Sequence, residues 1–202
     1  MNARDEILLG IRERHRFAAP ETAPYNAPPI GRLADAFAAC AKSAIAGVQV
    51  LERSIDVPQA VAELLRARNM PARIHIPAQS ELGKFAWNSV ANMEVDYTAP
   101  GPDDAALALA EFGIAETGTL VYAAAPEEPA SWHFRPGFEI AVLHARDIVA
   151  HFEDVIANVK AEGAMPSTLN LVTGPSRTAD IEQTLELGAH GPKELAILIV
   201  RD

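Results

Sequence analysis

An almost continuous apolar run stands at Phe138-Glu139-Ile140-Ala141-Val142-Leu143-His144. Other short apolar runs lie around it in the C-terminal half, at 118–125, 169–173 and 195–200. Runs that are apolar on both faces are typical of the buried strands of a parallel sheet that helices cover. The remaining segments leave room for crossover helices at 103–112, 145–162 and 178–187. These patterns predict an α/β fold, an open and mostly parallel sheet flanked by helices.

The N-terminal part of the sequence continues this alternation. It predicts a helix through Phe37 and Ala44, a strand at 48–51, a helix at 57–69 and a strand through Ile74 and Ile76. Residues 3–16 predict an amphipathic helix, and the prolines between residues 17 and 30 predict an extended linker. We therefore expect residues 1–30 to form a helix and Pro-rich linker, and residues 31–202 to form a single domain.

Composition narrows the classes of function. With 17 Lys and Arg against 27 Asp and Glu, the net charge of −10 repels phosphate backbones, so we expect no nucleic-acid partner. No apolar run approaches the roughly 18 residues that span a bilayer. Charged residues also interrupt the N-terminal segment, which is unlike a signal peptide. We therefore expect a cytoplasmic protein without a membrane span.

Metal and redox ligands are scarce in this sequence. The lone Cys40 cannot supply a thiolate cluster, and the histidines show no paired ligand spacing. We therefore expect no metal site and no cofactor in this chain. A redox centre would have to belong to a partner, and the sequence leaves a homo-oligomer open.

A carboxylate and two hydroxyls lie together in Ala115-Glu116-Thr117-Gly118-Thr119, just before the apolar strand that begins at Leu120. Glu116 is a candidate catalytic residue, as a nucleophile or a general base. Thr117 and Thr119 are candidate substrate-binding residues. The structural alternative is that Glu116 bonds local backbone amides and that Gly118 only permits a turn.

A second polar segment, Thr173–Glu182, follows the predicted strand at 169–173 and opens the predicted helix at 178–187. Ser176, Arg177 and Thr178, with free helix amides, would hold a carboxylate or a phosphate. Asp180 belongs to the same candidate site but disfavours a highly charged phosphate. The structural alternative makes Thr178 a helix N-cap, with Asp180 stabilising the first helical turn. Whether Asp180 pairs with Arg177 and blocks the site stays open.

Two further loops carry candidate residues. His190 lies between two glycines in Gly188-Ala189-His190-Gly191-Pro192, so it is a candidate catalytic histidine, and a turn histidine that bonds the backbone is the alternative. The aromatic loop Ser131–Pro136 is a candidate gate or partner contact, and an ordinary surface loop is its alternative.

Three segments together resemble the LUD domain of the LutC (YkgG) family. They are Gly113–Leu120, Pro166-Ser167 with Asn170–Glu182, and Gly188–Leu195. The resemblance covers about residues 103–200. It implies a NagB/RpiA/CoA-transferase-like fold and a part in oxidising L-lactate to pyruvate, alongside LutA-like and LutB-like iron–sulfur subunits. It supplies no firmly assigned catalytic residue, and Trp132 and His133 depart from the more aliphatic family pattern.

These observations leave two main hypotheses. The first is a non-redox subunit of an iron–sulfur complex that oxidises L-lactate, with the chain holding the small carboxylate anion or organising electron transfer. The second is a free-standing enzyme of the acyl/CoA-transferase or phosphosugar type that uses Glu116. A purely structural scaffold is a third possibility.

Overall fold

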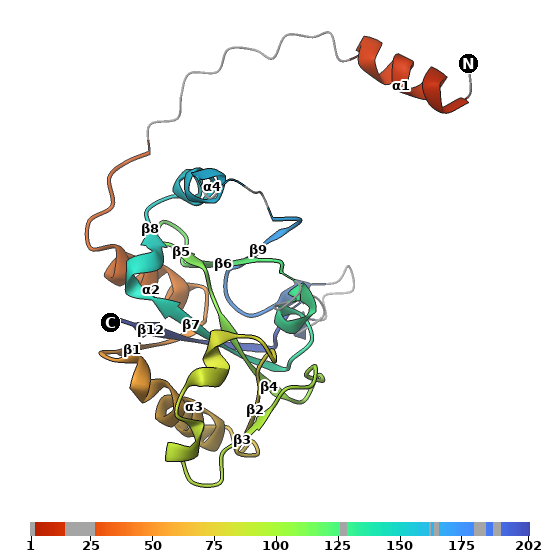
Figure 1. The fold of residues 1–202 in the computed structure, drawn as a ribbon. Helices are drawn as coiled ribbons and strands as arrows, with labels where there is room; N and C mark the ends of the chain where they lie inside the picture. The colour runs from red at the N-terminus through yellow and green to blue at the C-terminus, as the bar shows by residue number, and fades with distance from the viewer. Residues whose placement is uncertain are drawn as a thin grey trace.

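The larger sheet of the domain is entirely parallel. The computed structural model describes residues 3–14, 27–125, 129–161, 163, 166–179, 185–187 and 191–202. Six strands follow the order β1-β12-β7-β4-β2-β3 (Figure 1). They are β1 (Gly47–Leu51), β2 (Arg73–His75), β3 (Glu94–Asp96), β4 (Ala105–Leu109), β7 (Phe138–His144) and β12 (Glu194–Val200). The predicted α/β fold with a mostly parallel sheet is confirmed.

A second, four-stranded sheet has the order β8-β5-β6-β9. Its strands are β5 (Phe112–Ile114), β6 (Thr119–Ala123), β8 (Ile148–Val149) and β9 (Leu169–Val172). β5 pairs with β8 in parallel, whereas β6 runs antiparallel to both β5 and β9. Only Ala110 and Glu111 separate β4 from β5, so one extended segment passes from the larger sheet into the smaller one.

The crossover helix predicted at 103–112 is wrong, because this segment forms β4 and β5. A short run of small apolar residues fits a buried helix and a buried strand equally well. Tertiary pairing decides between them here. β4 pairs with β7 on one side and with β2 on the other, and residues 105–108 are buried.

The strand β7 shows how the layers are arranged. Ile140 and Val142 pack in one core with helix α3 (Val57–Ala67). Ala141 and Leu143 pack in a second core with helix α2 (Leu33–Ser43) and with β6 of the smaller sheet. Successive side chains of a strand point to opposite faces, so the apolar run of β7 serves both cores.

Helix α4 (Phe152–Ala161) forms the outermost layer. Its Val155 and Val159 pack on Val121 of β6, on the face of the smaller sheet that points away from α2. The helix predicted at 145–162 is therefore confirmed only in its second part. Residues 145–151 contain a short 3-10 helix (Ala145–Asp147) and β8 instead. Further 3-10 helices are Ser54–Asp56, Glu81–Lys84, Trp87–Ser89 and Ala130–His133.

The N-terminal helix is confirmed as α1 (Ala3–Arg14), and its Ile7, Leu9 and Ile11 side chains are exposed. Of the predicted linker, residues 17–26 lie outside the described residues, and residues 27–30 have no regular secondary structure. Within the described ranges, no helix has the length and the apolar character that crossing a bilayer requires.

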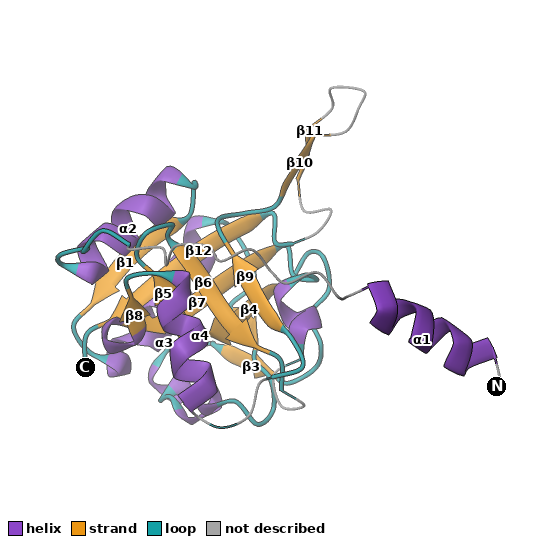
Figure 2. Ribbon diagram, turned by 90° about the horizontal axis from the view of Figure 1, so that it is seen from above, coloured by secondary structure: helices purple, strands orange, loops and turns teal. Residues whose placement is uncertain are grey.

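A two-stranded antiparallel ribbon, β10 (Arg177–Ala179) and β11 (Leu185–Leu187), projects from the body of the domain (Figure 2). It replaces the helix predicted at 178–187, so that prediction is wrong for the described residues. Thr178 is therefore a strand residue and not a helix N-cap. The free helix amides expected beside it are absent from the described backbone at this place.

Candidate functional site

Glu116 lies in the tight turn of the β5–β6 hairpin. The turn is closed by the Gly118 N–H, which donates to the Ile114 carbonyl at 2.9 Å, and the Glu116 N–H donates to the Ala150 carbonyl at 3.1 Å. Glu116 was expected to follow a helix, so its setting differs from the prediction. The turn places its side chain at the end of the smaller sheet, where it is 40% exposed.

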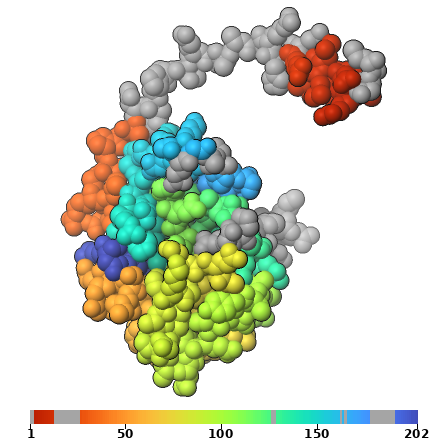
Figure 3. Space-filling view, in the orientation of Figure 1, coloured from red at the N-terminus to blue at the C-terminus, as the bar shows by residue number. Residues whose placement is uncertain are grey.

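The carboxylate of Glu116 bonds a histidine, His151, that the sequence pattern did not single out. His151 Nδ1 lies 3.0 Å from Glu116 Oε2, and His151 Nε2 lies 2.9 Å from the Pro28 carbonyl oxygen. His151 is buried and directly precedes α4. In the space-filling view, the orange residues that lead into α2 lie against the cyan residues of β8 and the start of α4 (Figure 3).

This arrangement favours a charged imidazole. Both ring nitrogens face acceptors, and only the protonated ring carries two N–H donors. The hydrogen bond to Glu116 accordingly raises the pKa of His151 above its ordinary value of 6.5. The Pro28 carbonyl and the charge of Asp154 also raise this pKa, whereas burial of the ring lowers it. The pair therefore favours the protonated form of His151, and it is open to solvent on the glutamate side.

We expect Glu116→Gln to lower the pKa of His151, because the substitution removes the largest cause of the upward shift. An NMR titration of the imidazole resonances measures this change. Glu153→Gln is the matched control, because Glu153 is an exposed acid of α4 that is not bonded to His151 in the described structure. If the pKa of His151 is unchanged in Glu116→Gln, Glu116 does not interact with His151 as described.

The same pair predicts a pH dependence of stability. The folded pKa lies above the unfolded one, so the stabilisation is complete below the unfolded pKa of 6.5 and is lost as the pH rises through the folded pKa. The Tm difference between the wild type and Glu116→Gln should therefore shrink across that window.

A chain of three hydroxyls connects the two motif loops, which are the β5–β6 turn at 115–119 and the segment that begins at Thr173. Thr119 Oγ1 lies 2.6 Å from Thr117 Oγ1 and 2.6 Å from Thr173 Oγ1. Thr119 is buried, whereas Thr117 and Thr173 are exposed. Three hydroxyls hold three protons and the two bonds use two of them. When the bonds run head to tail, Thr117 or Thr173 keeps a proton to donate to a ligand or to water. The structure thus brings Thr117 and Thr119 together and adds Thr173, which was within the predicted segment but not singled out.

Both loops rest on the same helix. A Cβ atom on Gly118 would lie 2.2 Å from the backbone N of Ala41, and one on Gly174 would lie 2.2 Å from the carbonyl O of Ala44. Both glycines also have positive φ, at 70° and 79°. Only glycine combines this backbone conformation with such a close approach. The C-terminal end of α2 therefore fixes the relative position of the two loops.

The expected anion site of the second loop is divided in two. Ser176 donates its backbone N–H to the Pro192 carbonyl at 2.9 Å and lines a hollow of about 170 Å³ with Thr173. Arg177 lines a different hollow with Arg68 and Lys193. Asp180 and His190 lie outside the described residues, so their predicted roles stay predictions.

Half of the aromatic loop is buried. Trp132 and His133 are buried, and Phe134, at 42% exposure, lines the hollow beside Thr173 and Ser176. His133 Nδ1 lies 3.1 Å from Oε1 of the fully buried Glu139, and its ring stacks on Tyr122 at 3.8 Å. The loop is thus held by a buried polar pair, a feature that the sequence pattern of β7 did not reveal.

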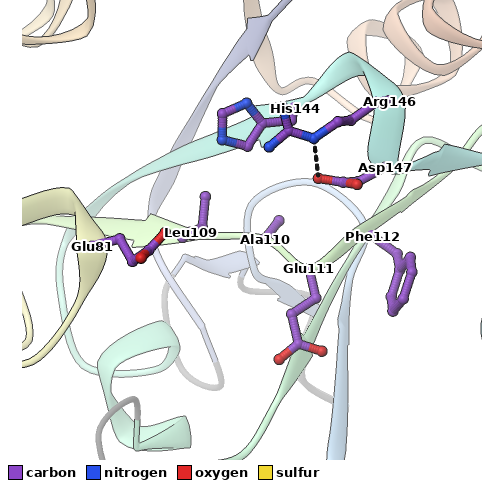
Figure 4. Close-up of a pocket in the computed structure, with 8 residues that line it drawn as sticks. All are labelled: Glu81, Leu109, Ala110, Glu111, Phe112, His144, Arg146 and Asp147. Carbon is purple, nitrogen blue, oxygen red and sulfur yellow. Dashed lines mark ion pairs between the residues drawn. The ribbon is translucent and has the colours of Figure 1, made fainter. Parts of the chain in front are cut away.

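A larger hollow of about 490 Å³ lies at the carboxyl ends of β4 and β7 (Figure 4). Ligands of open α/β sheets bind at this edge. It is lined by Glu81, Leu109, Ala110, Glu111, Phe112, His144, Arg146 and Asp147. Sequence reasoning missed its polar residues. The available signal was their position, because Glu111 and Arg146 follow apolar strands within a few residues.

The described side chains offer no obvious metal centre, since no three His, Cys, Asp or Glu among them are grouped closely enough to hold an ion. The polar chemistry of the described site therefore consists of a carboxylate–histidine pair, a hydroxyl chain and a separate group of basic side chains. Such groups position anions and transfer protons.

The fold matches that of a solved structure. A crystal structure of a DUF162 family protein from Deinococcus radiodurans superposes with a TM-score of 0.63, covering 85% of this chain and 99% of that chain at 21% sequence identity. The two proteins share a single-domain α/β fold.

Sequence comparison shows similarity to one family. Residues 103–200 match the model of the LUD domain. Lactate utilization protein C of Geobacillus thermodenitrificans is 32% identical over 121 residues, which are 57% of this chain and 50% of that protein. An uncharacterized protein of Neisseria meningitidis serogroup B is 39% identical over 140 residues, 63% of this chain and 60% of that protein.

Residues 103–200, just under half of the chain, match the LUD domain family, and the resemblance to the LutC family is confirmed. The matched region holds Glu116, His151 and the hydroxyl chain, whereas α2, on which both glycine loops rest, precedes it. The alignments span only about half to three-fifths of the length of these curated relatives.

Proposed function

We propose that the chain acts in lactate utilisation, as a non-redox subunit of a complex that oxidises L-lactate to pyruvate. The observation that carries this proposal is the LUD match over residues 103–200, together with relatives named lactate utilization protein C. The single cysteine of the chain supports the non-redox part, because a cluster needs several thiolates. The iron–sulfur clusters would then belong to LutA-like and LutB-like partners, with this chain in the cytoplasm.

The finer proposal is that the chain binds the carboxylate of the substrate. Arg177 supports it, because a guanidinium is well suited to a carboxylate and this one lines a hollow. Glu116 then has a different part, in which its pair with His151 holds the hairpin turn and the segment around Pro28 in place.

The test is lactate-dependent reduction of an artificial electron acceptor by the two iron–sulfur partners, with and without this chain. We expect the rate to fall at least about tenfold without the chain, a change of about 1.4 kcal/mol in the effective barrier. Chain carrying Glu153→Gln, an exposed substitution on α4, should restore the rate fully. An unchanged rate without the chain would overturn the proposal.

One observation favours a second candidate, a free-standing acyl-transfer enzyme. Glu116 is partly exposed and bonded to His151, whose pKa is raised, so a carboxylate nucleophile lies beside a side chain that can donate a proton. A Glu116 oxygen would bond to the acyl carbon of a thioester, and the departing thiolate would take a proton from His151. Mass spectrometry of the chain incubated with short acyl-CoA compounds should then show an acyl adduct that Glu116→Gln abolishes. Absence of any adduct in the wild type would exclude this mechanism for those substrates.

A further inference from the structure

A basic hollow lies where β1 and β12 begin. It encloses about 230 Å³, and the side chains that matter are those of Arg68, Arg177 and Lys193, with Glu194 beside them and Gly47 in the wall. The two strands start at Gly47 and Glu194, so the hollow is at their amino ends. It is thus distinct from the hollow of Figure 4, which lies at the carboxyl ends of β4 and β7.

One of the three cations is fixed and neutralised by its neighbours. Arg68 Nε lies 2.7 Å from Glu194 Oε2, and Arg68 Nη1 donates to the Leu64 carbonyl at 3.2 Å. The guanidinium carbon lies 4.0 Å from the centre of the Phe138 ring. Arg68 therefore forms a rigid, planar side of the hollow, and Glu194 is already paired.

The other two cations keep their charge available. Arg177 and Lys193 are exposed, and no carboxylate within the described residues bonds either of them. The chain as a whole carries a net charge of −10, so two cations with no carboxylate partner among the described residues are unusual around one hollow. A local positive potential of this kind draws small anions from solution.

The volume of the hollow limits the size of a ligand that it can hold. Its volume of about 230 Å³ is below the roughly 300–1,000 Å³ of sites for drug-sized molecules. Gly47 adds no side chain to the wall of the hollow. A Cβ at this position would meet no atom closer than 3.8 Å, so a larger residue could be placed there without a clash and would reduce the volume of the hollow. A single oxyanion group, rather than a large cofactor, matches these dimensions.

We propose that this basic hollow binds a small oxyanion, a phosphate or a carboxylate group, through Arg177 and Lys193, with Arg68 as the fixed side. If the ligand is the lactate carboxylate, the inference rests on the proposed function and names its binding site. The site itself depends only on the charges and the shape of the hollow. It also explains why Arg177 acts apart from Ser176, which lines another hollow.

The test uses inorganic phosphate as the probe, with binding to the full chain followed by calorimetry at constant ionic strength. Arg177→Gln and Lys193→Gln should each weaken binding about tenfold or more, because each removes a charge-assisted hydrogen bond. Lys160→Gln is the matched control, since it removes one positive charge from an exposed position on α4 and should leave binding unchanged. Gly47→Val, which keeps every charge, should also weaken binding, and Tm measurements confirm that each variant is folded.

A second arm uses L-lactate, alone and in competition with phosphate. Displacement of phosphate by lactate identifies a carboxylate site and joins the hollow to the proposed function. Phosphate binding that lactate does not displace keeps the oxyanion site and removes the substrate-carboxylate part of the proposed function. The inference is overturned if neither anion binds, or if Lys160→Gln weakens binding as much as Arg177→Gln and Lys193→Gln do.

Discussion

Gly118→Ala is expected to lower the free energy of unfolding by about 3 kcal/mol or more. Two causes add. Gly118 has a φ of 70°, which an L-residue with a Cβ adopts at a cost, and the new Cβ would lie 2.2 Å from the backbone N of Ala41. Because that neighbour is helix backbone, the contact is relieved only by moving the hairpin turn away from α2. Urea unfolding followed by circular dichroism measures the effect.

Gly163→Ala separates the two causes. Gly163 has a φ of 88°, but a Cβ there would have no heavy atom within 4 Å, so this variant reports the backbone strain alone. Its cost should be about 1 kcal/mol. If Gly118→Ala costs no more than Gly163→Ala, the hairpin turn is not held against α2, and the common support of the two motif loops is wrong.

Glu139→Ala is expected to lower the free energy of unfolding by about 3 kcal/mol. Glu139 is fully buried on β7 and bonds His133, so its removal leaves an unpaired polar ring and a cavity between the two sheets. The neighbouring Trp132 should become more exposed, because the aromatic loop loses its buried polar partner. Urea unfolding and the fluorescence of Trp132, in a Trp87→Phe background, measure both effects.

Glu139→Gln provides the matched comparison. It keeps an oxygen that accepts from His133 and keeps the shape of the side chain, so we expect a cost of about 1 kcal/mol. Equal costs for the two variants would show that the volume and the accepting oxygen, which Gln keeps and Ala removes, contribute nothing to stability. The idea that this pair holds Phe134 at the hollow beside Thr173 would then be wrong.

The strands that are buried on both faces could be predicted from the sequence. The apolar runs at 138–144 and 195–200 form β7 and β12, and the division of their side chains between two cores explains why both faces are apolar. The segment 103–112 could not be assigned from its own residues, because only pairing with β2 and β7 shows that it is extended. The division into two sheets likewise depends on tertiary contacts.

Only some residues of the candidate site could be identified from the sequence, and their contacts could not. Glu116, Thr117 and Thr119 were identified as a polar group, and the structure joins them to His151 and Thr173. His151 lies 35 positions from Glu116 and follows no ligand spacing, so no local pattern identifies it. Contacts between residues far apart in sequence are set by the topology, which a local pattern does not contain.

The place of β12 has a consequence for how the chain folds. This strand is the last one in the sequence, yet it lies between β1 and β7 and pairs with β1 over all five residues of that strand. During synthesis β1 must therefore wait until residues 194–200 have been made before its partner exists. Such long-range pairing slows folding and leaves strand edges open for longer. Until β12 is made, β1 and the edge of β7 that faces it both lack their partner strand.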